Sequence, residues 1–124
     1  MNKNILIIED DPSTLEVYKI ALEQAGFVVD TADSGEEALE KIKEDGHDLI
    51  LLDYILPGID GNEVLKEIRK NPKTKKIKVL ITTNYSKEAL KEKGKFVAGE
   101  KFVIKADYPP LKMIELIKKE LEAV

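Results

Sequence analysis

The chain alternates short apolar runs with amphipathic stretches, and this pattern repeats five times. The apolar runs lie at residues 5–8, 27–32, 49–52, 77–82 and 102–104. Runs rich in Ile, Val and Leu are typical of strands that are buried on both faces. The stretches between them carry apolar residues at spacings of three and four, which predicts helices. This order predicts an α/β fold, a doubly wound (βα)5 arrangement in which helices cover both faces of a five-stranded parallel sheet.

Capping residues and glycines mark the ends of the expected helices. Asp11, followed by Pro12, predicts one N-cap and Ser86 predicts another, while Ser34 opens a capping box. The expected core faces are Leu15, Tyr18, Leu22 and Ala25; Ala38, Leu39 and Ile42; Val64, Leu65 and Ile68; and Leu111, Ile114, Ile117 and Leu121. The helix after Ser86 has only a weak apolar face.

The composition excludes several kinds of site. The chain has no Cys and a single His, so it has neither a thiolate nor a histidine-cluster metal site, and no cysteine nucleophile. We expect that histidine, His47, to be a loop residue ahead of the third strand. The first apolar run has four residues before three acids, too short for a signal peptide or a membrane span. We therefore expect a cytoplasmic protein with no membrane insertion.

Charge is divided unevenly along the chain. Residues 1–65 carry 16 acidic and 4 basic side chains, whereas residues 66–124 carry 8 acidic and 16 basic ones. The segment from Arg69 to Lys78 holds six basic residues in ten, which could indicate a nucleic-acid patch or a solvated helix end and loop. We favour the second interpretation and expect no direct DNA binding, because this segment has no aromatic residue for base stacking.

Polar residues follow the apolar runs where parallel strands would share an edge. They are Glu9, Asp10 and Asp11; Asp53; Thr82, Thr83 and Asn84; and Lys105. Ligand sites of such folds lie at this edge. Converging carboxylates repel one another unless positive charge lies among them, and Mg²⁺ prefers oxygen ligands of this kind. The sequence therefore predicts a cation site.

These polar residues and the apolar runs before them, taken in their order along the chain, resemble the receiver domain of bacterial response regulators in its chemotaxis-type single-domain form. The matching stretches are residues 5–11, 48–53 with the turns at 57–58 and 60–61, 79–83, and 102–105. The spacing from Asp53 to Thr83 and from Thr83 to Lys105 also fits. The resemblance covers the whole chain and implies one receiver domain over residues 1–124, a flavodoxin-like three-layer sandwich with strand order 2-1-3-4-5.

The resemblance implies a role for each residue of the cation site. Asp53 would accept a phosphoryl group from a sensor histidine kinase or a phosphotransfer protein. Asp10 and Asp53 would bind Mg²⁺ together with the backbone carbonyl of Ile55, and Glu9 would act partly through water. The domain would not be an enzyme, since its chemistry would be limited to Mg²⁺-dependent self-phosphorylation and autodephosphorylation.

The resemblance also implies a conformational switch. Thr83 and Lys105 would contact the phosphoryl oxygens, and the new charge would pull Thr83 inward. Phe102 would then turn from exposed to buried. The chain ends soon after its last helix, which leaves no room for a DNA-binding domain, so we expect output through a downstream protein target. The expected contact face combines the fourth helix, the fifth strand and the fifth helix, and dimerisation through it is left open.

Several positions depart from the family pattern. Ala106 follows Lys105 where the family usually has proline after a cis bond, so we expect a trans bond and a rearranged loop. Asn84 stands where a small residue is usual and could narrow access to the phosphoacceptor. Ile55 and Tyr85 are bulky at positions that tune water access, which predicts slow self-hydrolysis of the acyl phosphate.

Other functions are less compatible with the sequence. A pseudo-receiver that binds partners without phosphorylation is disfavoured because every expected polar position is filled. A flavin-binding protein needs a Ser/Thr/Gly-rich loop after its first strand, where this chain is acidic. An aspartate-nucleophile phosphatase carries paired aspartates two apart at that strand, whereas the nucleophile candidate here follows the third. The charge asymmetry is best explained by a domain with an acidic and a basic side and the site between them.

Overall fold

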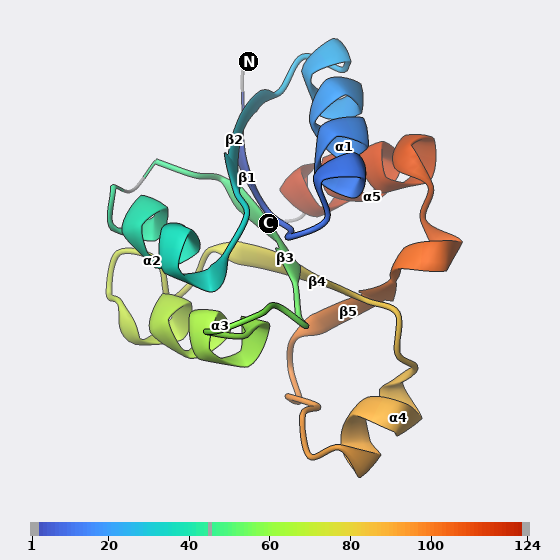
Figure 1. The fold of residues 1–124 in the computed structure, drawn as a ribbon. Coiled ribbons are helices and arrows are strands. Elements are labelled where there is room, and N and C mark those ends of the chain that lie inside the picture. The colour runs from blue at the N-terminus through green and yellow to red at the C-terminus, as the bar shows by residue number, and fades with distance from the viewer. Residues whose placement is uncertain (1–2, 45, 123–124) are drawn as a thin grey trace.

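The five predicted strands pair into one parallel sheet in the computed structural model, which describes residues 3–44 and 46–122 (Figure 1). The strands are β1 (Asn4–Ile8), β2 (Val28–Ala32), β3 (Leu49–Asp53), β4 (Lys78–Thr83) and β5 (Lys101–Ile104). The helices are α1 (Pro12–Gln24), α2 (Gly35–Lys43), α3 (Gly61–Lys70), α4 (Lys87–Glu92) and α5 (Pro110–Glu122), with a 3-10 turn at Lys105–Asp107. The strand order β2-β1-β3-β4-β5 confirms the predicted doubly wound, flavodoxin-like fold.

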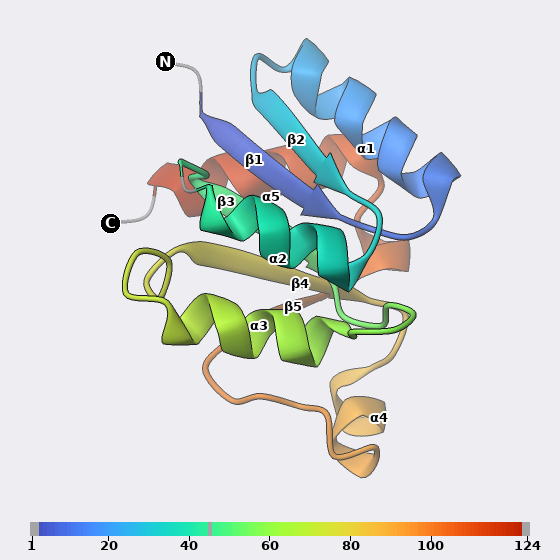
Figure 2. The ribbon, with the colours of Figure 1, turned by 60° about the vertical axis from the view of Figure 1, so that its left-hand side comes forward.

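Successive strand side chains point to opposite faces of the sheet, and each face is covered by helices. Ile5 and Ile7 of β1 pack in the core formed with α1 and α5, whereas Leu6 and Ile8 pack in the core formed with α2 and α3. Figures 1 and 2 show these two helix pairs on opposite sides of the sheet. All five residues of the central strand β3 are buried. Each fully buried Leu or Ile contributes about 1.5–3 kcal/mol of transfer free energy.

Side-chain caps begin four of the helices. Asp11, Ser34 and Ser86 accept backbone N–H groups at the starts of α1, α2 and α4, as predicted, and Asp60 does the same for α3. Each cap contributes about 1 kcal/mol to helix stability. The helices are short, with 13 residues in α1 and in α5, and none within the described residues is long and apolar enough to cross a membrane.

The predicted core face of α5 is confirmed except at its first residue: Ile117 is buried, and Ile114 and Leu121 pack against the same core. Met113, Leu116 and Ile117 are buried, whereas Leu111, expected in the core, is 78% exposed. Leu111 lies in the first turn of the helix, directly after Pro110, whereas the buried residues lie further along, where α5 packs against α1. The buried residues of α5 share one core with α1 and with the strands, and Leu111 lies outside it.

The helix α4 has only six residues and one buried side chain, Leu90. Figure 2 shows it standing away from the sheet below α3. In the segment that follows α4, Lys95 makes two contacts with the rest of the molecule. Its Nζ lies 3.0 Å from Oδ2 of Asp60, and its carbonyl oxygen accepts a hydrogen bond from the hydroxyl of Tyr54. These contacts attach the end of α4 to the loop between β3 and α3.

The basic segment that begins at Arg69, in the last turn of α3, is only partly solvated. Arg69 forms a two-pronged ion pair with Glu100, with both N···O distances at 2.8 Å, and donates to the carbonyl oxygens of Lys75 and Ile77. The expectation of a solvated helix end is therefore wrong for Arg69, since this side chain holds the loop between α3 and β4 in place. His47 lies in the loop before β3, as predicted.

Candidate functional site

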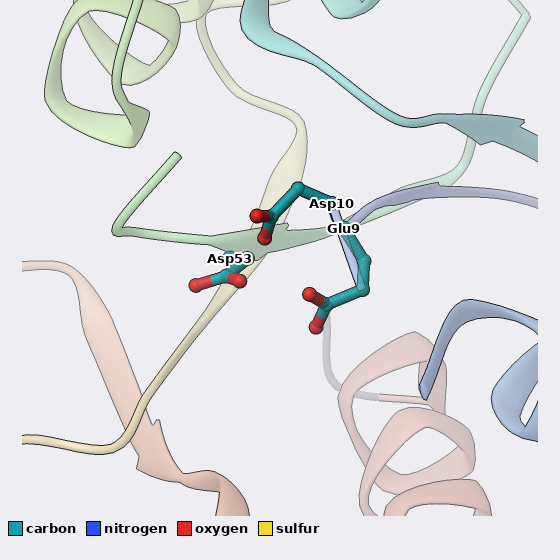
Figure 3. A group of neighbouring side chains, drawn as sticks. All are labelled: Glu9, Asp10 and Asp53. Atoms are coloured by element: carbon teal, nitrogen blue, oxygen red, sulfur yellow. The ribbon is translucent and has the colours of Figure 1, made fainter. Parts of the chain in front are cut away.

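The register of the sheet brings the predicted acidic residues together. Ile8 of β1 pairs with Leu52 of β3, so Glu9 and Asp53 follow side by side. One carboxylate oxygen from each of Glu9, Asp10 and Asp53 lies within 4.8 Å of the other two, at the ends of the two strands (Figure 3). Glu9 is 4% exposed and Asp53 is 5% exposed, whereas Asp10 is open to solvent.

The side chain of Lys105 places one positive charge beside these carboxylates. Its Nζ lies 2.8 Å from Oε1 of Glu9 and 2.9 Å from Oδ2 of Asp53. It directly follows β5, which lies two strands away from β3 at the sheet edge. The side chain is mostly buried, so its charge acts in an environment where ion pairs are stronger than in water.

The charges in the cluster are not balanced. Burial raises the pKa of Glu9, and the hydrogen bonds from Lys105 and the Asp11 N–H oppose this rise without cancelling it. Burial lowers the pKa of Lys105, but its hydrogen bonds to Glu9 and Asp53 outweigh that effect, so this pKa is raised. Lys105 is therefore charged at neutral pH, and one ammonium faces three carboxyl groups. A bound cation would relieve the repulsion among them.

The donor set suits a hard divalent cation. The three carboxyl groups offer oxygen ligands, and no nitrogen or sulfur ligand is among them, which fits Mg²⁺. Ile55 lies on the wall of the site, and its N–H donates to Oδ1 of Asp53 at 3.2 Å. The role of its carbonyl oxygen as a metal ligand stays a prediction.

The cluster lies in a cleft of about 600 Å³ at the carboxyl edge of the sheet. The cleft is lined by Glu9, Asp10, Asp11, Thr14, Tyr18, Asp53, Ile55, Asn84, Tyr85, Lys105 and Ala106. Loops after β1, β3, β4 and β5 therefore all contribute to it. Ile55, Asn84 and Tyr85, the three residues expected to control access, are exposed on its wall.

Thr83 ends β4 and is buried, but it does not line the cleft. Its Oγ1 accepts the N–H of Tyr85 at 3.0 Å. The neighbouring candidate, Thr82, donates its hydroxyl to the carbonyl oxygen of Leu52 at 3.3 Å. Because the hydroxyl of Thr83 acts as an acceptor in its bond with Tyr85, its proton can still be donated to another group. Its contact with a phosphoryl group stays a prediction.

Phe102 is half-buried in this structure rather than exposed. Its ring meets Tyr54 edge-on at 5.3 Å and stacks with Phe96 at 5.2 Å. Tyr54 directly follows the phosphoacceptor candidate Asp53, and Phe96 lies in the segment after α4. No spacing pattern in the sequence links either residue to Phe102. The proposed movement of Phe102 would have to begin from this aromatic cluster.

The loop after Lys105 has the trans backbone that Ala106 predicted, since the described residues contain no cis peptide bond. The chain forms a 3-10 turn here, with the N–H of Tyr108 donating to the carbonyl oxygen of Lys105 at 3.1 Å. Tyr18, expected only as a core residue, is buried and also lines the cleft, and its hydroxyl donates to the carbonyl oxygen of Tyr108 at 2.8 Å. Burial raises the pKa of Tyr18, so its hydroxyl remains a donor. Sequence reasoning missed this contact because the two residues lie far apart in the chain.

The parallel sheet, with three acidic side chains and a lysine at the carboxyl ends of its strands, has the arrangement expected of a receiver domain. Residues 5–118 match the family profile of the response regulator receiver domain. Since this match spans most of the chain, the chain belongs to that family and is a receiver domain of two-component systems.

Solved structures of response regulators are similar over nearly the whole chain. The response regulator TrrA from Thermotoga maritima, in complex with Mg²⁺ and a beryllium fluoride, is 36% identical with a TM-score of 0.79, covering 96% of this chain and 98% of that one. The chemotaxis response regulator CheY4 of Vibrio cholerae is 26% identical with a TM-score of 0.84 over the same shares of the two chains.

Curated relatives are longer proteins. The transcriptional regulatory protein ResD of Bacillus subtilis is 32% identical over 92% of this chain and 46% of its own length. The phosphate regulon transcriptional regulatory protein PhoB of Rhizobium meliloti is 30% identical over 85% of this chain and 46% of its own length. The chain thus spans about half the length of the curated relatives it matches.

Proposed function

We propose that Asp53 accepts a phosphoryl group from a phosphohistidine of a sensor histidine kinase or a phosphotransfer protein. The observation that carries this proposal is the environment of Asp53. Its carboxylate is buried at the base of the cleft, held by the Ile55 N–H and the Lys105 ammonium, with Glu9 and Asp10 alongside. The end of β3 therefore presents one carboxylate to the cleft, oriented by these two contacts.

In the transfer, a carboxylate oxygen of Asp53 forms a bond to phosphorus while the P–N bond of the phosphohistidine breaks. The imidazole leaves with the electron pair of that bond, and an acyl phosphate remains on Asp53. Phosphoryl transfer depends on positioning and on stabilising negative charge at the phosphoryl oxygens. Lys105 already lies 2.9 Å from Asp53, and we expect it to contact these oxygens together with the hydroxyl of Thr83.

The metal fits the same residues. Asp10 and Asp53 would hold Mg²⁺ with the carbonyl oxygen of Ile55, and Glu9 would act through water. When bound, the ion supplies positive charge that neutralises carboxylates and phosphoryl oxygens together. The solved relative in complex with Mg²⁺ and a beryllium fluoride supports this assignment.

The proposed output is a change of shape that controls a protein partner. The acyl phosphate adds about −2 of charge to Asp53, and Thr83 and Phe102 would respond to it. The contact face would be α4, β5 and α5, with dimerisation through that face as one form of output. We propose no DNA binding by residues 1–124 and no catalysis beyond self-phosphorylation and autodephosphorylation, and we place this reaction in the cytoplasm.

The proposal is tested by intact-mass spectrometry after incubation with acetyl phosphate and Mg²⁺. We expect a single phosphoryl adduct in the wild type, because acetyl phosphate, like phosphohistidine, carries an activated phosphoryl group. The adduct should be absent in Asp53→Asn and after removal of Mg²⁺ with a chelator.

Asp48→Asn is the matched control for this experiment. Asp48 lies just before β3, at the opposite end of the strand from Asp53, and accepts the N–H of Asn4, which an asparagine oxygen can also do. This variant should form the adduct at the wild-type rate. A wild type with neither an adduct nor Mg²⁺ binding would contradict the proposal and favour a pseudo-receiver.

A further inference from the structure

Lys105 follows the last paired residue of an edge strand. The ladder between β4 and β5 ends where Thr83 pairs with Ile104, so the backbone of Lys105 lies just beyond the sheet. Its Nζ must nevertheless reach Glu9 and Asp53 at once, at 2.8 and 2.9 Å. Both contacts depend on how the loop after β5 holds the Lys105 backbone.

Two successive hydrogen bonds connect that backbone to α1. The N–H of Tyr108 donates to the carbonyl oxygen of Lys105 at 3.1 Å and closes the 3-10 turn. The carbonyl oxygen of Tyr108 in turn accepts the hydroxyl of Tyr18 at 2.8 Å. Ala106 and Asp107, within the turn, are exposed, so the turn has little packing of its own.

Tyr18 is well placed to act as a fixed anchor. Its side chain is buried in the core between α1 and α5, with its hydroxyl reaching the far end of the turn. The N-cap of α1 is Asp11, whose N–H donates to the carboxylate of Glu9. The helix α1 and its N-cap therefore contact both Glu9 and the turn that follows Lys105.

We infer that Tyr18 is a positioning residue for phosphoryl transfer, which acts through the turn at residues 105–108 to hold the Lys105 ammonium over Asp53. This inference rests on the proposed function. Without the hydroxyl, the Tyr108 carbonyl loses its partner and the turn can shift, while the aromatic ring still fills the core. Because Lys105 sits at the end of this connection, its ammonium would spend less time in contact with Asp53.

The test compares the rates of adduct formation with acetyl phosphate and Mg²⁺ in wild type, Tyr18→Phe, Lys105→Ala and the double variant. Losing one hydrogen bond in the positioning chain should slow the reaction about fivefold. The same substitution should have no further effect in the Lys105→Ala background, because Tyr18 acts through Lys105. Thr74→Val is the matched control and should react at the wild-type rate, since it loses a buried hydroxyl hydrogen bond, to the carbonyl oxygen of Ile68, away from the cleft.

Amide hydrogen exchange provides a second measurement. The N–H of Tyr108 should exchange faster in Tyr18→Phe than in the wild type, because the turn that protects it is loosened. An unchanged rate of phosphorylation in Tyr18→Phe would overturn the inference, as would an equal slowing in both Lys105 backgrounds or unchanged exchange at Tyr108. A wild type that forms no adduct would instead show that the proposed function has failed, and the inference would fall with it.

Discussion

At the scale of single residues, we expect two side chains on the cleft wall to limit the access of water to Asp53. Ile55 and Tyr85 are 39% and 40% exposed, and both line the cleft that holds Asp53. Hydrolysis of an acyl phosphate needs a water molecule in line with the bond that breaks. Side chains of this size at the entrance leave water few positions from which to attack.

Replacing both residues with polar ones should therefore shorten the life of the acyl phosphate. We expect Ile55→Asn/Tyr85→Asn to lose its phosphoryl group about tenfold faster than the wild type, which corresponds to about 1.4 kcal/mol in the barrier. The measurement is the decay of the intact-mass adduct after the phosphodonor is removed.

Val17→Asn is the control for this prediction, because Val17 is a similarly exposed apolar residue on α1 that does not line the cleft. It should decay at the wild-type rate. Rapid decay in the wild type that the double substitution leaves unchanged would show that the apolar wall does not limit hydrolysis.

Individual residues of the site were predictable to the extent that their signals are local. Asp53 ends an apolar run, and Glu9 and Asp10 end another, so a parallel sheet is enough to bring them together. The Tyr18 contact with Tyr108 and the aromatic partners of Phe102 depend on how distant segments pack. No pattern in the sequence specifies those contacts.

At the scale of elements, the loop between β3 and α3 is tied to the segment after α4. Asp60 caps α3 through the N–H groups of Asn62 and Glu63, and it also pairs with Lys95. Burial raises the pKa of Asp60, but the hydrogen bond from Lys95 and those from the α3 backbone outweigh this, so its pKa is lowered below the ordinary value. This loop directly follows Asp53, so the contact joins the site to the expected output face.

This ion pair predicts a pH-dependent contribution to stability. Because the folded-state pKa of Asp60 is below the unfolded value, its contribution is present above about pH 4 and is lost as the pH falls through the folded-state pKa. Asp60→Asn keeps the cap but loses the charge, and should lower the free energy of unfolding at neutral pH by about 0.5–1 kcal/mol.

Denaturant unfolding from pH 7 to pH 3 measures this contribution. The difference between wild type and Asp60→Asn should shrink as the pH falls below about 4. Lys95→Met should cause a similar loss at neutral pH and add little to Asp60→Asn, since both remove the same pair. Additive losses, or a difference that is constant with pH, would contradict this account of the contact.

The positions of the elements were largely predictable, and so were most of the helix faces that pack on the core. Caps at Asp11, Ser34 and Ser86 depend on neighbours in sequence and appear where expected. The exposed Leu111 shows the limit of the pattern. Leu111 continues the spacing of the apolar stripe, but it lies in the first turn of α5 and does not reach the core that buries Ile117.

At the scale of the whole molecule, the site joins the two halves of the charge distribution. Strands β2, β1 and β3 come from the acidic half of the sequence, and β4 and β5 come from the basic half. The strand order therefore places the two halves toward opposite edges of the sheet. The resulting separation of surface charge stays a prediction. Lys105 carries the charge of the basic half into the acidic cluster.

Because one ammonium faces three carboxyl groups, Mg²⁺ should stabilise the fold. At about ten times its Kd, the ion should raise the free energy of unfolding by about 1.4 kcal/mol and Tm by about 5 °C. The measurement is a thermal melt against a NaCl control of equal ionic strength. Asp10→Asn should lose this response and Asp48→Asn should retain it; a shift that NaCl reproduces would contradict a specific site.

The location of the phosphoryl group tests the central claim most directly. The protein is phosphorylated with acetyl phosphate and Mg²⁺, the acyl phosphate is trapped by borohydride reduction, and the modified residue is identified by peptide sequencing in a mass spectrometer. We predict that Asp53 alone is modified. Modification at Asp10 or at another residue in place of Asp53 would contradict the account.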